Sequence, residues 1–263
     1  MGLLLLLGGS GTGIVDRYPT VAAAFSLRKI RDNYGGAAIR VRRSSDSAEL
    51  DVPFISKDLD TSSLLSFVGA GDGFVTTWYD QKSGNNAVNA TAGTQPLIVS
   101  GGVLQTENSK PAVVFGINKI LTTGANVAIT RPFTWCVTRR VQADDSEVVT
   151  SVAFRMQQIA SGNAVRIRVT GGSGASLASA GNTFSIFTGQ IQASPNARLR
   201  RNGGSWSTST GYTETPAAAP IILGRTTGAG ISNHCESVYF SSELSEAEIS
   251  AIESNMNAYW GAY

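Results

Sequence analysis

Short apolar segments recur along most of this 263-residue chain, and turns rich in Gly, Ser and Asn separate them. The segments contain many Val, Ile and aromatic residues, and several alternate with period two, as half-buried β-strands do. Many short strands without long helices between them favour an antiparallel sandwich or jelly roll over a doubly wound sheet. The predicted strands span residues 39–43, 74–79, 97–99, 112–115, 133–138, 148–154, 165–169, 184–187, 221–223 and 237–240.

Three segments are predicted to be helices that cover the sheets. The first spans residues 20–34, where apolar side chains recur at helical spacing before a Gly-Gly stop. The second spans residues 61–68 and ends at Gly69. The third begins with a capping box between Ser245 and Glu248, and an apolar stripe follows it to Tyr259.

The amino terminus is expected to form a separate arm. It contains five consecutive leucines, Leu3, Leu4, Leu5, Leu6 and Leu7. A secretory signal would require a Lys or Arg before the leucines, and none is present. The run is also far shorter than the roughly 20 residues of a membrane span. We expect residues 1–18 to be a Leu/Gly-rich anchoring arm and residues 19–263 to be one jelly-roll domain. The alternative is a strand that packs on its own domain.

Composition excludes several classes of function. The formal net charge is +2, so the chain lacks the strong basic character typical of nucleic-acid binding. A single His removes most catalytic triads and His-based metal sites. We expect no cofactor or metal; the alternative is a Ca²⁺ site formed by Asp72, Asp80 and Asn85. Cys136 and Cys235 are too few for a disulfide framework; we expect buried free thiols, with one bridge between paired strands as the alternative.

Two blocks of sequence resemble known proteins. The first is AFSLRKIRDNYGGAAIRVRRSSDSAELDVPF together with the following LDTSSLLSFVGAGDGFVTTWYDQKSGNNAVNATAGTQPLIV and KPAVVF. It resembles a segment of phage virion proteins and the amino-terminal part of the catalytic domain of α-L-arabinofuranosidase B, a family-54 glycoside hydrolase. The second, ESVYFSSELSEAEISAIESNMNAYWG, resembles the closing strand and helix of laminin-G-like or concanavalin A-like modules. The resemblance implies an all-β fold, a concanavalin A-like antiparallel β-sandwich with a few short covering helices.

Carboxylates decide between the functions that this resemblance implies. Glycoside hydrolysis ordinarily needs two carboxyl groups that face each other across the scissile bond. Residues 148–213 contain no Asp or Glu, and the catalytic motifs of the family have no match here. Asp80 in the Trp-Tyr-Asp-Gln motif is the tempting carboxylate, although an Asp at this position can simply bind the backbone amides of the turn. We therefore predict that the protein is not an enzyme.

A carbohydrate-binding surface is a further expectation. Trp206 lies in a polar loop and could stack on a sugar, unless it folds back on the sheet as a hairpin residue. Residues 148–230 carry seven Arg and one acid, a basic surface that could bind an anionic glycan or simply be solvated. The candidate binding residues are Trp206, Asn202, Arg200, Arg166 and Arg168.

These expectations combine into one hypothesis. The chain is predicted to be a non-enzymatic structural component of a tailed-phage virion, either a capsid decoration, a head fibre or a tail protein, that assembles in the host cytoplasm. Its leucine-rich arm would bind other virion proteins, and the chain would form a homo-oligomer that binds glycans but neither nucleic acid nor membrane. The alternative is a glycoside hydrolase of arabinofuranosidase type.

Overall fold

The computed structural model describes residues 13–141, 147–151, 154–159, 164–169, 174–178, 182–211, 217–224 and 231–263. It confirms the all-β fold, because hydrogen-bonded antiparallel strands account for most of the regular structure and only short helices accompany them. None of the described helices is long and apolar enough to cross a membrane. Leu3 to Leu7 lie outside the described residues.

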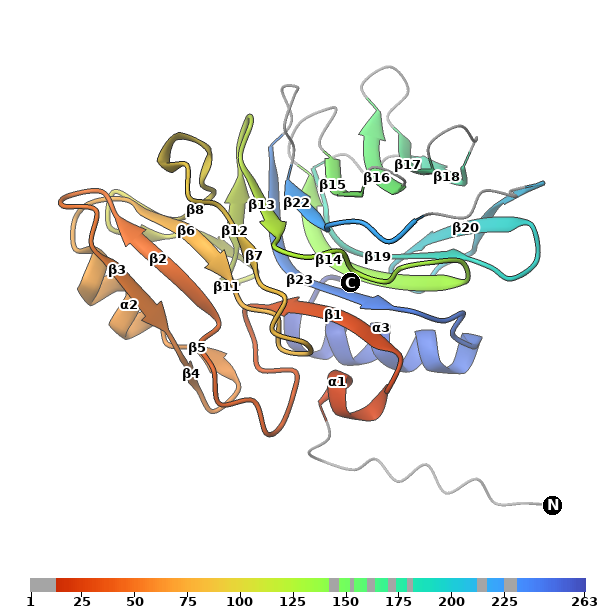
Figure 1. Cartoon of the computed structure of the whole chain (residues 1–263), viewed down its shortest axis with the longest axis horizontal. Helices are drawn as coiled ribbons and strands as arrows, with labels where there is room; N and C mark the ends of the chain where they lie inside the picture. The colour runs from red at the N-terminus through yellow and green to blue at the C-terminus, as the bar shows by residue number, and fades with distance from the viewer. Residues whose placement is uncertain are drawn as a thin grey trace.

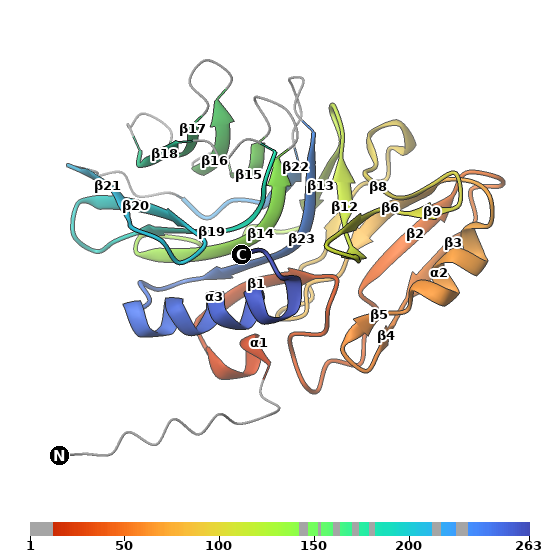
Figure 2. The ribbon, with the colours of Figure 1, turned by 180° about the vertical axis from the view of Figure 1, so that it is seen from behind.

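The central sheet has the order β21–β20–β19–β14–β23–β1, and the start of β23 also pairs with β12. Helices α1 and α3 cover one face of this sheet (Figures 1 and 2). The bounds are β1 (Val21–Ser26), β12 (Val113–Phe115), β14 (Phe133–Val141), β19 (Phe184–Ile191), β20 (Asn196–Arg201), β21 (Ser207–Thr210), β23 (Ser232–Phe240), α1 (Ile14–Arg17) and α3 (Glu246–Trp260).

A second run of strands faces the other side of the central sheet, in the order β7–β13–β22–β15–β16–β17–β18 (Figure 1). Buried Val165 and Ile167 of β17 point into the space between the two layers. The bounds are β7 (Ala87–Val88), β13 (Ile120–Thr123), β15 (Glu147–Ser151), β16 (Phe154–Ile159), β17 (Ala164–Val169), β18 (Ser176–Ala178) and β22 (Ile222–Gly224).

The remaining strands form one end of the molecule, in the order β3–β2–β6–β8, with β9 paired to β8. Helix α2 packs beside β3 and β2 (Figure 2). The bounds are β2 (Ile39–Arg43), β3 (Glu49–Val52), β6 (Gly73–Trp78), β8 (Leu97–Ser100), β9 (Val103–Leu104) and α2 (Thr61–Val68), and the two small hairpins are β4 (Phe54–Ile55) with β5 (Asp58–Leu59) and β10 (Thr106–Glu107) with β11 (Lys110–Pro111).

The helix predicted over residues 20–34 is wrong, because Val21–Ser26 is strand β1. This strand pairs with β23 from Val21↔Phe240 to Ser26↔Glu236, and five of its six residues are buried. A strand buried on both faces loses the polar–apolar alternation that identifies a half-exposed strand. Its run of small apolar residues therefore imitates the periodicity of a helix.

The other two helices confirm their predicted capping. Asp60 accepts a hydrogen bond from the Ser63 amide at the start of α2, and Gly69 ends that helix. In α3, Ser245 and Glu248 form the reciprocal capping box. The apolar side of α3 packs on the central sheet, and Trp78, Trp135 and Trp260 are all buried. Both cysteines are buried and free.

One buried ion pair fixes α3 and the start of the chain to the central sheet. The Arg28 guanidinium donates to the Glu236 carboxylate of β23 through Nε at 2.6 Å and through Nη2 at 3.0 Å. Ser26 Oγ and Trp260 Nε1 donate to the same carboxylate at 3.0 and 2.9 Å. Glu236 is fully buried, so its charge depends on these four hydrogen bonds.

Candidate functional site

The predicted binding residues do not form one site. Arg200 on β20 and Trp206 lie together, whereas Arg166 lies on β17 in the other layer and is partly exposed. The Arg168 side chain lies outside the described part of the chain. Asn202 shapes the turn after β20: it has a left-handed φ of 54°, and its Oδ1 accepts from the Ile186 amide at 2.8 Å.

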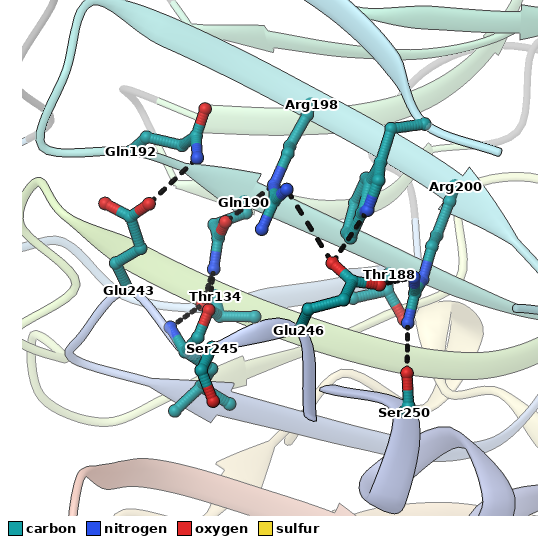
Figure 3. A network of polar contacts seen from close by, with 12 residues as sticks. Thr134, Thr188, Gln190, Gln192, Arg198, Arg200, Glu243, Ser245, Glu246 and Ser250 are labelled. Atoms are coloured by element: carbon teal, nitrogen blue, oxygen red, sulfur yellow. Dashed lines mark hydrogen bonds and ion pairs between the residues drawn. The ribbon is translucent and has the colours of Figure 1, made fainter. Parts of the chain in front are cut away.

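Trp206 belongs to a cluster of cations and a carboxylate that we call the Arg–Trp–Glu cluster, made of Arg198, Arg200, Trp206 and Glu246. Arg198 and Arg200 are two positions apart on β20 and extend toward α3 (Figure 3). Their guanidinium carbons lie 4.1 and 4.6 Å from the centre of the indole ring. The indole Nε1 donates to Glu246 Oε2 at 3.0 Å. The protein itself therefore already holds the indole ring, which also packs against the core.

The buried side of this cluster fastens α3 to the sheet. Arg200 donates to Glu253 through Nε and Nη2, both at 2.8 Å, and it also pairs with Glu246. Burial lowers the pKa of Arg200, but the hydrogen bonds and charges of Glu253 and Glu246 outweigh that effect, so the pKa is raised. Thr188 Oγ1 donates to Glu253 at 2.5 Å. Both carboxylates thus neutralise one arginine and are not available as a catalytic pair.

Asp80, the carboxylate that the sequence singled out, is a structural residue. It is 1% exposed, and its carboxylate accepts hydrogen bonds from the backbone amides of Ala24, Lys82 and Ser83 at 2.8–3.1 Å. This confirms the interpretation that Asp80 binds the amides of its turn. Its oxygens have no room for a substrate.

A more accessible pair of carboxylates lies on β3. Glu49 and Asp51 are two positions apart, so their side chains share the exposed face of the strand, at 41% and 43% exposure. Arg40 of β2 donates to Asp51 at 2.8 and 2.6 Å, but its Nε lies 4.0 Å from the Glu49 carboxylate. Tyr79 Oη also donates to Asp51, at 2.6 Å. Glu49 is therefore loosely held, whereas Asp51 is firmly held.

These contacts separate the protonation behaviour of the groups around Asp51. The hydrogen bond from Arg40 lowers the pKa of Asp51, and the Tyr79 hydroxyl acts in the same direction. Burial and the neighbouring Asp51 raise the pKa of Tyr79 to about 12. At neutral pH, Asp51 is an ionised carboxylate that accepts from a neutral phenol.

A surface pocket of about 310 Å³ adjoins Glu49. Arg42, Thr77, Asn89 and Gln95 contribute hydrogen-bonding groups to its lining, and Arg42 Nε donates to Gln95 Oε1 at 2.9 Å. Amides, hydroxyls and a guanidinium are the groups that bind sugar hydroxyls. The alternating Glu-Leu-Asp-Val of β3 is a sequence signal for this site, and the prediction from the sequence missed it.

Two larger pockets among the described residues are less suited to hydrolysis. One of about 680 Å³ is lined by the segments 83–85 and 125–128 and has no acidic side chain. The other, about 510 Å³ between α1 and α3, contains Glu243 and Glu248. Glu243 accepts from the Gln192 side chain and the Ala193 amide, and Glu248 is used in the capping box. Among the residues with described side chains, no three His, Cys, Asp or Glu cluster to hold a metal ion.

No protein-family model matches the chain, and no curated protein matches it. Several solved structures match the chain in fold. A GH54 α-L-arabinofuranosidase soaked with a cyclic sulfate inhibitor matches 94% of this chain at 16% identity with a TM-score of 0.73. An arabinofuranosidase complexed with arabinofuranosyl-α-1,2-xylobiose matches the same share at 16% identity with a TM-score of 0.71. The chain spans 65% and 64% of the lengths of these two proteins.

These matches correct two predictions from the sequence. They contradict the non-enzymatic virion component, because the proteins that share the fold over 94% of the chain are glycoside hydrolases. They also give no support to a phage origin or to a capsid or tail role. At 16% identity the likeness establishes the fold alone, the β-sandwich of the arabinofuranosidases.

Proposed function

We propose that the protein is a glycoside hydrolase that cleaves α-L-arabinofuranosides. The observation that carries this proposal is the likeness of fold to arabinofuranosidases over 94% of the chain, with a TM-score of 0.73. The exposed pair of carboxylates on β3, of which Glu49 lines the polar pocket, supports it from the geometry of the chain itself. Hydrolysis of a glycosidic bond needs such a pair.

In this proposal Glu49 and Asp51 share the catalytic work. Residues two apart on a strand are separated by roughly 6.6 Å, which falls in the range of about 6.5–9.5 Å between the paired carboxyl groups of inverting glycosidases. Asp51 is held ionised by Arg40, so it acts as the general base that takes a proton from the water attacking the anomeric carbon. Arg40 approaches Glu49 only to 4.0 Å, and we assign to Glu49 the role of general acid at the leaving oxygen.

Two substrates test these two roles separately. Release of 4-nitrophenolate from 4-nitrophenyl α-L-arabinofuranoside needs little proton donation, because that leaving group is a weak base. Release of xylobiose from an arabinofuranosyl-xylobiose needs full protonation of the leaving oxygen. Glu49→Gln is expected to lose roughly 10²–10⁴-fold in turnover of the second substrate and much less with the first. Asp51→Asn is expected to lose activity on both substrates.

Glu243→Gln provides a matched control, since it makes the same substitution in the 510 Å³ pocket. Its turnover should stay within threefold of the wild type. Absence of turnover of both substrates by the wild-type chain would refute the hydrolase proposal. If both Glu49→Gln and Asp51→Asn keep the turnover of the wild type, the assignment of these two residues is refuted, but the proposal of a hydrolase stands.

The Arg–Trp–Glu cluster remains a separate prediction of glycan binding. Its indole ring and Arg198, which lies 3.7 Å from Glu246, are the groups available to an anionic sugar, since Arg200 is buried and neutralised. A glycan array with wild type and Trp206→Ala tests it: signal lost in the variant supports the prediction, and no signal from either protein refutes it.

A further inference from the structure

Arg139 on β14 is a fully buried cation with no counter-ion among the described residues. Its exposure is 0%, and none of its three guanidinium nitrogens has a hydrogen-bond partner. The next residue shows the usual arrangement: Arg140 points to the opposite face of the strand and pairs with Glu107 at 2.7 Å. Among the described residues no carboxylate is within ion-pair distance of Arg139.

The groups beside Arg139 are polar, and some of their atoms have no hydrogen-bond partner. Its neighbours across the sheet are Ser185 on β19 and His234 on β23. Neither Ser185 Oγ nor His234 Nδ1 has a hydrogen-bond partner, although His234 Nε2 lies 2.9 Å from Ser232 Oγ. The ring of Phe187 lies 5.4 Å from the guanidinium carbon.

These side chains face the space between the two layers, away from α3. The His234 ring lies 4.6 Å from the ring of Phe115, and Phe115 in turn contacts the backbone of β22 at Gly224. Glu107 and Glu236 lie on the other face and are neutralised by Arg140 and Arg28, and the side chains of Asp144, Asp145 and Glu147 lie outside the described residues.

The charge of Arg139 cannot be removed by losing a proton at neutral pH. Burial lowers the pKa of Arg139 to about 9, which leaves the guanidinium protonated. Burial and the charge of Arg139 lower the pKa of His234, so this ring is neutral and adds no second positive charge beside Arg139. A buried charge without compensation is strongly unfavourable, and no carboxylate of the described residues compensates this one, so an anion from solution would stabilise it.

We propose that Arg139 binds one small monovalent inorganic anion between the two layers, with chloride as its probe. The Ser185 hydroxyl, which can rotate its proton toward the ion, is the second donor. Full burial of Arg139 below aromatic side chains selects an ion of this size over a sugar carboxylate. This inference stands independently of the proposed hydrolase activity.

The melting temperature of the full chain tests the proposal when sodium chloride replaces sodium gluconate at constant ionic strength. We expect a saturating rise of roughly 5–10 °C by the time chloride reaches about 100 times its Kd. Bromide should act in the same way. Arg139→Met should abolish the rise and melt higher than the wild type in gluconate, because it removes an uncompensated charge.

Arg140→Met is the matched control, because it removes the neighbouring cation on the other face; it should retain the chloride response. Ser185→Ala should weaken chloride binding roughly threefold to tenfold. Crystals grown in bromide should show an anomalous peak within hydrogen-bond distance of Arg139. A melting temperature that is insensitive to chloride, a response retained by Arg139→Met, or a bromide crystal without that peak would overturn the proposal.

Discussion

His234, the one histidine of the chain, should make the stability of the protein depend on pH in a narrow window. It is fully buried, and burial, followed by the charge of Arg139, lowers its pKa well below the ordinary value of 6.5. In the unfolded chain the ring regains that ordinary value. Below about pH 6.5 the unfolded state therefore binds a proton at this ring that the folded state does not bind. The free energy of unfolding falls as the pH falls, with a limiting slope of about 1.4 kcal/mol per pH unit.

Urea unfolding between pH 5 and 8, at fixed chloride, measures this slope. The window is clean because Asp and Glu in an unfolded chain titrate near 4, below the range used. The corresponding change in melting temperature is roughly 3–6 °C per pH unit for a chain of this size. The His234→Gln variant should be less stable than the wild type at pH 8, but its free energy of unfolding should not change between pH 6.5 and 5. An equal slope in His234→Gln, or no slope in the wild type, would refute the assignment of a neutral buried His234.

Three stability predictions follow from the packing of the central sheet. Glu236→Gln leaves the buried Arg28 without its counter-charge and should cost about 3–5 kcal/mol in urea unfolding; a loss below 1 kcal/mol would contradict a buried pair. Gly189→Ala places a Cβ 1.9 Å from the Trp135 ring and should cost about 1–3 kcal/mol with altered near-ultraviolet circular dichroism, so an unchanged spectrum would speak against this packing. Ser245→Ala removes the cap of α3 and should lower the melting temperature by the equivalent of about 1 kcal/mol; no change would mean that the capping box is not formed in solution.

Local signals in the sequence predicted much of the fold. The alternating strand at residues 39–43 and the capping box at Ser245 are confirmed, because their cues lie within a few neighbouring residues. The prediction for residues 21–26 failed for the opposite reason, because strand β1 depends on pairing with β23, more than 200 residues later. Periodicity alone cannot distinguish a strand buried on both faces from a buried helix.

The candidate site was less predictable than the fold. Trp206 appeared to stand alone in a polar loop, because nothing local indicates that Glu246 of a distant helix binds its indole nitrogen. Glu49 and Asp51 lay within a recognised motif, but their exposure depends on which face of β3 is turned to solvent. Likewise, alternation places Arg139 and Arg140 on opposite faces, and only the assembled layers determine which one is buried.

The position of β23 between β14 and β1 has a consequence for biosynthesis. Both neighbours are synthesised first, and Ser26 can pair with Glu236 only after the ribosome has added 210 more residues. At a translation rate of about 5–20 residues per second this delay lasts roughly 10–40 s. During that time the nascent chain presents unsatisfied strand edges at the ribosome exit, so its yield in a cell should depend on chaperones that shield them.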